Sequence, residues 1–403
     1  MNILVLTNEY PNNNYPKPDS PWILPFFARE WVKQGNKVTV IVNSSRFPAL
    51  FYLLVKFVKG YFSNKFNITA SNLSDKTWSR PFSFDDMGVK VFNSPMLKIK
   101  PGGAFKKCVV KRQLNKIEGL LLKENFIPDV ITGHWLNPQL MLVAGLGQIY
   151  HCRTAFVFHS DYTKEKLIYF RANKYIGLID RIGCRSIYAA NEIKKNLSLQ
   201  TLPFVCYSGV ANEFVERVSD NTVFNQEPSS FDIITAARLV NYKNINSVIE
   251  AVEKIKNTNV TVRIVGDGPL RDDLTNLASS LGLSNRITFM GKISRDKLQE
   301  EMHRCMMFVL ISEHEVFGLV YLEAMLQGCI VIASRESGVD GIIVDGVNGF
   351  LCESGNSEEL SNIITKVAKM SIPERKQISA KAQQTALNFS DSKVAERYLK
   401  DIS

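Results

Sequence analysis

The stretch EHEVFGLVYLEAMLQG, residues 313 to 328, places two carboxylates in a segment that otherwise has the composition of a buried helix. Glu315 precedes Gly318, where we expect the helix to begin, and Glu323 lies further along it. At about 1.5 Å per residue, Glu323 falls about 7 Å along the axis. A carboxylate there can accept two hydrogen bonds from a vicinal diol, and Glu315 can reach a sugar hydroxyl. Taken alone, the two residues are better explained by a solvent-facing Glu323 and a first-turn Glu315 that the helix dipole stabilises.

The beginning of this helix and a basic loop elsewhere are both suited to a diphosphate. Free backbone N–H groups at Gly318, Leu319 and Val320, reinforced by the helix dipole, form an anion site. Arg238 and Lys243, in the segment ARLVNYKN, follow the first strand candidate of the second half. Two cations there can neutralise a diphosphate and stabilise it as a leaving group. For either cation alone, a solvated basic loop before a helix is a fair alternative.

Glycine turns end two more strand candidates in the second half of the chain. Gly266 and Gly268 lie in VGDGPL, directly after the apolar run VTVRI. This turn is only part of a dinucleotide-binding fingerprint, because Arg271 occupies the place of the third glycine. The next strand candidate ends in GKIS, where the backbone groups of Lys292 and Ile293 can meet a base. Both turns are therefore candidate parts of a nucleotide site.

These residues can work together only if the fold brings several strand ends to one place. Short apolar strand candidates alternate with helical patterns along the chain, which predicts parallel sheets with helices on both faces. We therefore expect an α/β fold with two doubly wound, Rossmann-like domains facing across a cleft, where the carboxyl ends of the strands bind ligands. The strand candidates include residues 2 to 7, 37 to 43, 129 to 134 and 154 to 160, and the runs FDIITAARL, RITFMG, CMMFVLIS and CIVIAS.

Composition along the chain divides these elements into domains. We expect a first domain over residues 1–215 and a second over 231–385, joined by the polar stretch ERVSDNTVFNQEPSS at 216–230. Residues 386–403 have helical spacing, and we expect this helix to pack back toward the first domain. A length of 403 residues also favours two domains over one.

The overall composition limits the classes of function. With 45% hydrophobic and 22% charged residues, the chain has the composition of a globular protein. The formal charge of +10 indicates an anionic partner but does not distinguish nucleic acid, an acidic membrane and a phosphorylated substrate. Seven scattered cysteines without a C-x-x-C pair favour reduced thiols in the cytoplasm over disulfides or a zinc site. No segment predicts a signal peptide or a membrane-spanning helix.

The segments quoted above resemble the signature of the family-four retaining glycosyltransferases, which have the GT-B fold. The element E-x-F-G-x-x-x-x-E, from Glu315 to Glu323, is specific to that signature, whereas the glycine turns are not. The resemblance is strong over residues 230 to 352 and looser over the first 215 residues. The N-terminal loop NEYPNNNYPKPDSPWILPFF departs from the family, because it lacks the glycines that many members have near the phosphates.

Carried over residue by residue, the resemblance implies a nucleotide-sugar site in the second half of the chain. Glu323 would bind the ribose hydroxyls, and Glu315 would lie beside the donor sugar. Arg238 and Lys243 would bind the diphosphate. The helix beginning at Gly318 and the two glycine turns would complete the donor-binding site.

The resemblance also implies roles for two histidines in the first half. In the family, a histidine at the place of His134 points at the donor sugar, and His159 falls at a strand end that would face the same cleft. For each of them, the plainer interpretation is a hydrogen-bonded loop residue. His134 joins Glu315, Arg238 and Lys243 in the set that we expect to be catalytic, and His159 joins the donor-binding residues.

The reaction implied by the resemblance is transfer of a sugar, of the hexosyl type, from a UDP- or GDP-linked donor to an acceptor hydroxyl, with retention at the anomeric carbon. Because Arg238, Lys243 and the helix N-terminus would stabilise the departing diphosphate, we expect no metal site and no cofactor. By family analogy, the acceptor is a lipid-linked or other glycan in the assembly of bacterial surface polysaccharide, either lipopolysaccharide O-antigen or capsule.

Two other functions stay open at this point. A nucleotide-sugar epimerase of GT-B fold would share the nucleotide site, but it would release a free sugar and ignore acceptors. A non-catalytic nucleotide-sugar-binding protein would bind the donor without turnover, although the intact Glu315, Glu323, Arg238 and Lys243 argue against it. An NAD-dependent dehydrogenase is less compatible, because no complete G-x-G-x-x-G follows the first strand candidate.

Two basic stretches in the first half predict contact with an anionic membrane. Residues 46–66 combine Phe, Tyr and Leu with lysines, residues 98–116 are strongly basic, and neither stretch contains an acid. Such segments are suited to the headgroup region. We therefore expect a cytoplasmic enzyme, peripheral on the inner face of the cell membrane and without a nucleic acid partner. The alternatives are a core helix with a solvated basic face, or a basic site for a soluble phosphorylated acceptor.

Overall fold

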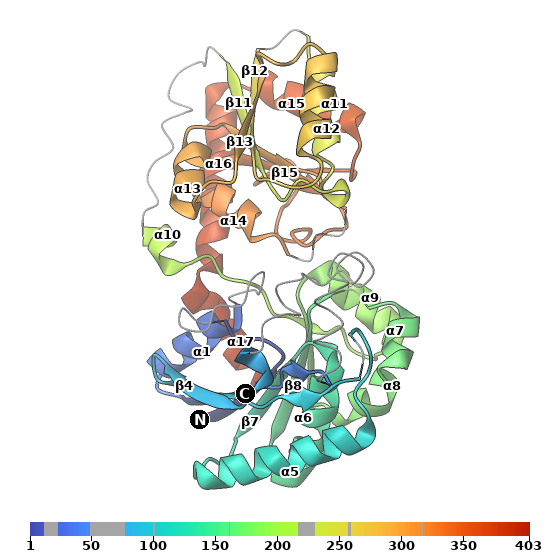
Figure 1. Ribbon diagram of the computed structural model, residues 1–403. Helices are drawn as coiled ribbons and strands as arrows, with labels where there is room; N and C mark the ends of the chain where they lie inside the picture. The colour runs from blue at the N-terminus through green and yellow to red at the C-terminus, as the bar shows by residue number, and fades with distance from the viewer. Residues whose placement is uncertain are drawn as a thin grey trace. The chain divides into compact units, whose positions relative to one another are not determined.

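The computed structural model describes residues 1–11, 23–48, 77–99, 101–160, 162–216, 230–256, 259–313, 315 and 317–403 (Figure 1). The chain divides into two compact units, which are described one at a time. Unit 1 comprises Met1–Arg185, Ala189–Cys206 and Val394–Ser403, and unit 2 comprises Ser186–Tyr188 and Tyr207–Lys393.

Unit 1 is built on an eight-stranded sheet whose strands, from one edge to the other, are β10 (Phe204–Val205), β9 (Arg181–Cys184), β8 (Arg153–Phe158), β7 (Val130–His134), β1 (Asn2–Thr7), β2 (Lys37–Val42), β5 (Val89–Asn93) and β4 (Phe82–Asp86). Neighbouring strands are parallel, except that β4 runs antiparallel to β5. The chain winds outward from β1 in one direction and from β7 in the other. The switch point of this sheet, where ligands of such folds bind, therefore lies between β1 and β7.

Helices cover the unit 1 sheet because its central strands are apolar on both faces. After their first residues, β1, β2 and β8 are buried throughout, as expected for parallel strands between two helical layers. A small separate sheet pairs β3 (Ser45–Arg46) with β6 (Met96–Leu97). The helices assigned to unit 1 wholly or for most of their length are α1 (Ile23–Lys33), α5 (Lys107–Lys123), α6 (Leu136–Tyr150), α7 (Lys164–Tyr169), α8 (Ala172–Tyr175), α9 (Ile187–Leu197) and α17 (Asp391–Ile402), with short 3-10 turns at η1 (Thr77–Ser79) and η2 (Ile176–Leu178).

The end of the chain is part of the unit 1 core. Trp31 of α1 donates its indole N–H to the carbonyl oxygen of Ala395 in α17, at 2.9 Å. The ring of Tyr398, which is 1% exposed, lies 5.2 Å from the rings of both Phe27 and Trp31. These contacts hold α17 against α1 (Figure 1).

Unit 2 has a six-stranded, fully parallel sheet in the order β13 (Ile287–Gly291), β12 (Val260–Val265), β11 (Phe231–Ala236), β14 (Met307–Leu310), β15 (Ile330–Ser334) and β16 (Phe350–Cys352). Its order reverses between β11 and β14. The loops that follow these two strands therefore flank the switch point of unit 2. Its helical elements are α10 (Asn212–Glu216), η4 (Asn241–Lys243), α11 (Ile245–Lys254), α12 (Arg271–Ser280), α13 (Arg295–His303), α14 (Leu319–Leu326), α15 (Ser357–Lys369), α16 (Ile372–Ala386) and η5 (Leu387–Phe389).

Helix α14 is buried over most of its length. From Tyr321 to Leu326 its side chains are at most 5% exposed. On one side, α16 is hydrogen-bonded to the end of α14, because Gln383 donates to the carbonyl oxygen of Leu326 at 3.1 Å and Ser379 donates to that of Gly328 at 2.7 Å. The apolar composition of residues 319 to 326 thus has a packing cause, and the carboxylate inside this segment requires a separate explanation.

The structure confirms the predicted α/β fold with two doubly wound domains, because each unit has a parallel sheet with a switch point near its centre. The first-half strand candidates correspond to β1, β2, β7 and β8. Unit 2 takes in Tyr207–Lys393, whereas the sequence placed the second domain at 231–385. Most of the expected connection at 216–230 and most of the apolar stretch 46–66 lie outside the described residues. Among the helices that the structure describes, none is long and apolar enough to cross a membrane.

Candidate functional site

Two loops meet at the switch point of unit 2. One follows β11 and carries Arg238 and Lys243, and the other follows β14 and carries Glu315. The backbone N–H of Glu313 donates to the carbonyl oxygen of Tyr242 at 2.7 Å, which joins the second loop to the first. The side chains predicted to handle a diphosphate and a sugar are therefore held at one edge of the sheet.

Gly318 sets the position of the α14 N-terminus. Its φ of +77° is left-handed, and a Cβ on it would lie 2.4 Å from Cε2 of Tyr321, so only glycine fits here. The Tyr321 hydroxyl in turn donates to the carbonyl oxygen of Leu310 at 2.8 Å, which ties the first turn of α14 to the end of β14. Residues Gly318, Leu319 and Val320 are partly exposed. The N–H groups at the start of a helix have no partner one turn earlier, and the anion site expected at this turn stays a prediction.

Lys243 and Glu315 form an ion pair beside this helix start. The Lys243 ammonium donates to Oε2 of Glu315, and their side chains are 14% and 16% exposed. The ammonium also lies 5.3 Å from the centre of the Tyr242 ring. An ammonium has three donors, so Lys243 can hold Glu315 in place and still donate to a phosphate oxygen.

Arg238 is exposed, and among the described residues its side chain has neither an ion pair nor a hydrogen bond.

The turn after β12 needs its two glycines because it packs against the backbone of the loop after β11, the loop that carries Arg238. A Cβ on Gly266 would lie 1.8 Å from the carbonyl oxygen of Ala237, and one on Gly268 would lie 2.4 Å from that of Leu239. Gly266 and Gly268 thus let the turn after β12 pack closely on the loop after β11, and their part in donor binding stays a prediction.

Glu323 is 5% exposed, so it does not face solvent. Its Oε1 accepts from both Nε, at 2.9 Å, and Nη2 of Arg295 at the start of α13. Both bonds end on the same oxygen, which leaves Oε2 as an acceptor without a partner among the described residues. The guanidinium of Arg295 also stacks over the Phe214 ring at 4.9 Å. In this orientation, the second oxygen of the carboxylate can accept a hydrogen bond from a hydroxyl group.

Arg295 is the site residue that the sequence analysis missed. It lies a few positions after Lys292 and Ile293, which were predicted to meet a base. Lys292 is exposed and Ile293 is half-buried. The only signal was a cation at the beginning of a helix, and nothing in its spacing linked it to Glu323, 28 residues away. The structure therefore adds one charged side chain to the predicted donor site.

In unit 1, the two predicted histidines are in direct contact. His134, at the end of β7, has a side chain that is buried at 0% exposure. Its Nδ1 lies 2.8 Å from Nε2 of His159, and its Nε2 lies 2.9 Å from the hydroxyl of Tyr398. His159 is the partly exposed member of the pair, and its ring stacks on Trp135 with 4.1 Å between ring centres. Of the two, only His159 is partly exposed, and the roles expected for both histidines at the donor sugar stay predictions.

Both histidine rings are neutral near pH 7. Burial lowers the pKa of His134 well below its ordinary value, and the nearby positive charge of Arg185 lowers it further. Burial also lowers the pKa of His159, and electrostatic interactions with His134 and Arg185 lower it further. A neutral imidazole has one donor and one acceptor nitrogen, so the pair can orient a hydroxyl but does not add a positive charge to the site.

The predicted residues thus fall into two groups, one in each unit. Unit 2 brings together Arg238, Lys243, Glu315 and the start of α14, with Glu323 further along that helix, and unit 1 brings together the two histidines. Among the described residues, no group of three or more His, Cys, Asp or Glu side chains is arranged to hold a metal ion.

The fold and the unit 2 site define a class, the two-domain GT-B proteins. HepE of Anabaena, solved in complex with UDP, superimposes with a TM-score of 0.68 over 99% of each chain at 19% identity. Residues 220–385 match the family described as "Glycosyl transferases group 1". Over these residues the chain is therefore similar to the group 1 glycosyltransferases, in agreement with the family-four resemblance stated from the sequence.

The curated relatives agree with this assignment. An uncharacterized glycosyltransferase of Methanocaldococcus jannaschii is 31% identical over 188 residues, which are 47% of this chain and 49% of that protein. LpsE of Rhizobium meliloti, a lipopolysaccharide core biosynthesis glycosyltransferase, is 31% identical over 169 residues, which are 41% of this chain and 48% of LpsE. The chain spans about half the length of these relatives.

Proposed function

We propose that this protein is a retaining glycosyltransferase that moves a hexosyl group from a nucleoside diphosphate sugar to an acceptor hydroxyl. The observation that carries the proposal is the switch point of unit 2, where the N-terminus of α14 adjoins the Lys243–Glu315 ion pair and Glu323 keeps one oxygen open. The group 1 match covers this region, and the neighbour HepE was solved with UDP bound. Both findings support a nucleotide-sugar donor.

Each side chain has a role that follows from its place. The first-turn N–H groups of α14, Lys243 and the exposed Arg238 would bind the diphosphate and stabilise its charge as it leaves. Oε2 of Glu323 would accept a ribose hydroxyl, while Arg295 keeps the carboxylate oriented. Glu315, held by Lys243, would lie beside the donor sugar. Because three sources of positive potential converge on the diphosphate, we propose a reaction that does not need a metal ion.

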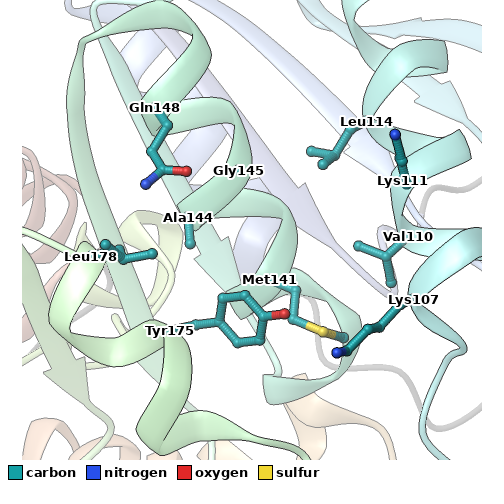
Figure 2. A pocket seen from close by; sticks show the side chains of 10 residues that line it. All are labelled: Lys107, Val110, Lys111, Leu114, Met141, Ala144, Gly145, Gln148, Tyr175 and Leu178. Carbon is teal, nitrogen blue, oxygen red and sulfur yellow. The ribbon is translucent and has the colours of Figure 1, made fainter.

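The proposed acceptor is a lipid-linked glycan of bacterial surface polysaccharide, either lipopolysaccharide or capsule, at the inner face of the cell membrane. The similarity to LpsE supports this acceptor class. The surface of unit 1 offers a matching feature, a pocket of about 200 Å³ between α5, α6 and η2 (Figure 2). Val110 and Met141 contribute apolar walls, and Lys107 and Lys111 lie beside them. None of the described residues lining this pocket is acidic, so its charge suits an anionic headgroup.

The function is tested by incubating the full chain with UDP- and GDP-hexoses, with and without a lipid-linked hexose as acceptor. We expect release of the nucleoside diphosphate to require the acceptor, and the product to retain the anomeric configuration of the donor by NMR. EDTA should leave the rate unchanged. Free hexose as the main product in the absence of acceptor would instead indicate hydrolysis or epimerisation, and binding without turnover would indicate a binding protein.

A variant of the ion pair tests the catalytic assignment. Lys243→Met should lower the transfer rate by about 10² to 10³, because it removes a charge contact to the leaving diphosphate. Lys254→Met is the matched control, since Lys254 also forms an ion pair in unit 2, with Glu358 at 3.1 Å, but lies on α11. Equal rates for the Lys243 variant and the control would contradict the proposed role of this lysine.

A further inference from the structure

A chain of hydrogen bonds lies behind the histidine that reaches the surface of unit 1. It runs from Thr132 Oγ1 to the hydroxyl of Tyr398 at 2.6 Å, from that hydroxyl to Nε2 of His134 at 2.9 Å, and from Nδ1 of His134 to Nε2 of His159 at 2.8 Å. The first three members are at most 1% exposed. Nδ1 of His159 is the free end of the chain, because it has no partner among the described residues.

Neutral imidazoles allow only two arrangements of protons along this chain. If the Tyr398 hydroxyl donates to Nε2 of His134, then Nδ1 of His134 carries the proton and donates to His159. His159 must in that case carry its own proton on Nδ1. If the Tyr398 hydroxyl accepts, every proton is reversed and Nδ1 of His159 becomes an acceptor. The proton on Nδ1 of His159 is therefore coupled to one buried hydroxyl.

The first arrangement matches the chemistry of the groups. An imidazole nitrogen is the strongest acceptor in the chain, and a phenol is a better donor than the aliphatic hydroxyl of threonine, although burial raises the pKa of Tyr398. The Tyr398 proton therefore belongs on the bond to His134, and Thr132 donates to the tyrosine oxygen. Hydrogen bonds in such a buried chain strengthen one another, so the arrangement is held as a unit.

We propose that Tyr398 is a positioning residue, which fixes the proton of His159 on Nδ1 through His134 and so presents a hydrogen-bond donor to the substrate. This inference rests on the proposed function, a sugar transfer, and adds to it a contact of His159 in unit 1 with a hydroxyl of a sugar substrate. The Tyr398 ring is held by packing, with ring centres 5.2 Å from Phe27 and 5.9 Å from Phe204. Tyr398→Phe therefore removes the bonds to His134 and Thr132 while the packing of the ring is kept.

Ring nitrogen NMR tests the proposal without any activity measurement. The full chain has five histidines, so long-range proton–nitrogen spectra can be assigned with one substitution per histidine. In the unaltered protein, we expect His159 to be protonated on Nδ1. In Tyr398→Phe, Nε2 of His134 loses its donor, and we expect the proton of His159 to move to Nε2. Thr132→Val removes only the hydrogen bond between Thr132 and Tyr398, and it should shift the tautomer of His159 less.

The control is Tyr10→Phe. Tyr10 is also 0% exposed in unit 1, and its hydroxyl donates to Asp86 at 2.8 Å, remote from the histidines in the bond network. This variant should leave the tautomer of His159 unchanged while it tests the general cost of losing a buried tyrosine hydroxyl. An unchanged His159 tautomer in both Tyr398→Phe and Thr132→Val would overturn the proposal.

Kinetics separate this inference from the proposed function. If the protein is active, Tyr398→Phe should lower kcat about tenfold or more and leave KM for the nucleotide sugar nearly unchanged. The substitution alters the N–H group that His159 presents to a sugar hydroxyl, and it leaves the diphosphate contacts intact. Tyr10→Phe should leave kcat unchanged. An unaltered protein that transfers no sugar, yet shows the tautomer shift on substitution, would overturn the proposed function and leave the role of Tyr398 supported.

Discussion

At the scale of single residues, the two oxygens of Glu323 have different environments. Arg295 donates two hydrogen bonds to Oε1, whereas no described residue donates to Oε2. We expect Glu323→Ala to weaken UDP or GDP binding about tenfold to a hundredfold, since a hydrogen bond to a charged group contributes about 1.5 to 3 kcal/mol. Calorimetric titration measures the change. Glu359→Ala, which breaks the ion pair with Arg335 elsewhere in unit 2, is the control and should leave the affinity unaltered.

The carboxylates could be predicted from the sequence, but their partners could not. Glu315 and Glu323 stand at fixed spacing within one short segment, so their relation survives in the sequence itself. Arg295 and Tyr398 come from other elements, and Tyr398 lies 264 residues from the histidine that it contacts. Hydrogen bonds between distant segments depend on tertiary packing, which has no period or spacing to reveal it. The contacts of His134 with His159 and Tyr398 could not be read from the sequence for this reason.

At the scale of elements, the first turn of α14 depends on a backbone conformation that only glycine adopts easily. Gly318→Ala would combine a left-handed φ of +77° with a Cβ 2.4 Å from the Tyr321 ring, so the turn must move. We expect binding of the nucleoside diphosphate to weaken by tenfold or more, as about 1.4 kcal/mol of lost contact corresponds to each factor of ten.

Gly282→Ala provides the matched control for this helix start. Gly282 has a similar φ of +70°, but a Cβ there would meet no atom within 4 Å. The substitution should cost about 1 kcal/mol of folding stability through backbone strain, without a change in nucleotide affinity. Equal affinities for the Gly318 and Gly282 variants would mean that the N-terminus of α14 does not bind the phosphates.

The strands were predictable for a physical reason that the loops lack. Strands such as β14 and β15 are buried on both faces, so selection for burial leaves an uninterrupted apolar run in the sequence. The glycine turn after β12 was predicted as a turn and as part of the donor site, and its part in the donor site stays a prediction. In the structure, Gly266 and Gly268 are explained by contact with the neighbouring backbone, which a single sequence does not display.

At the scale of the whole molecule, the charge of +10 is compatible with attraction to an anionic membrane, and we propose that this attraction acts at the pocket beside α5. We expect the protein to sediment with vesicles that contain phosphatidylglycerol, less so at high salt, and hardly at all with phosphatidylcholine alone. Changing Lys106, Lys107, Lys111 and Arg112 to Ser should abolish most of this binding, because each basic residue near such a surface contributes about 1 kcal/mol.

A second variant with the same net charge distinguishes the effect of this surface on vesicle binding from the effect of total charge. Lys254, Lys369, Lys376 and Lys381 are exposed residues of unit 2, and changing them to Ser removes the same number of positive charges. This variant should bind vesicles nearly as well as the unaltered chain. Equal losses for the two variants would show that attraction is spread over the whole molecule, and the proposed membrane-facing side of unit 1 would have to be abandoned.

The placement of Tyr398 in unit 1 has a consequence for biosynthesis. The 264 residues between His134 and Tyr398 take about 13 to 53 s to translate at about 5 to 20 residues per second. During that interval, β7 and β8 can already pair, but Nε2 of His134 lacks its tyrosine partner. A nascent chain stalled after unit 2 therefore has an incomplete histidine pair, and the first unit acquires its final hydrogen-bonding state only when the last helix has emerged from the ribosome.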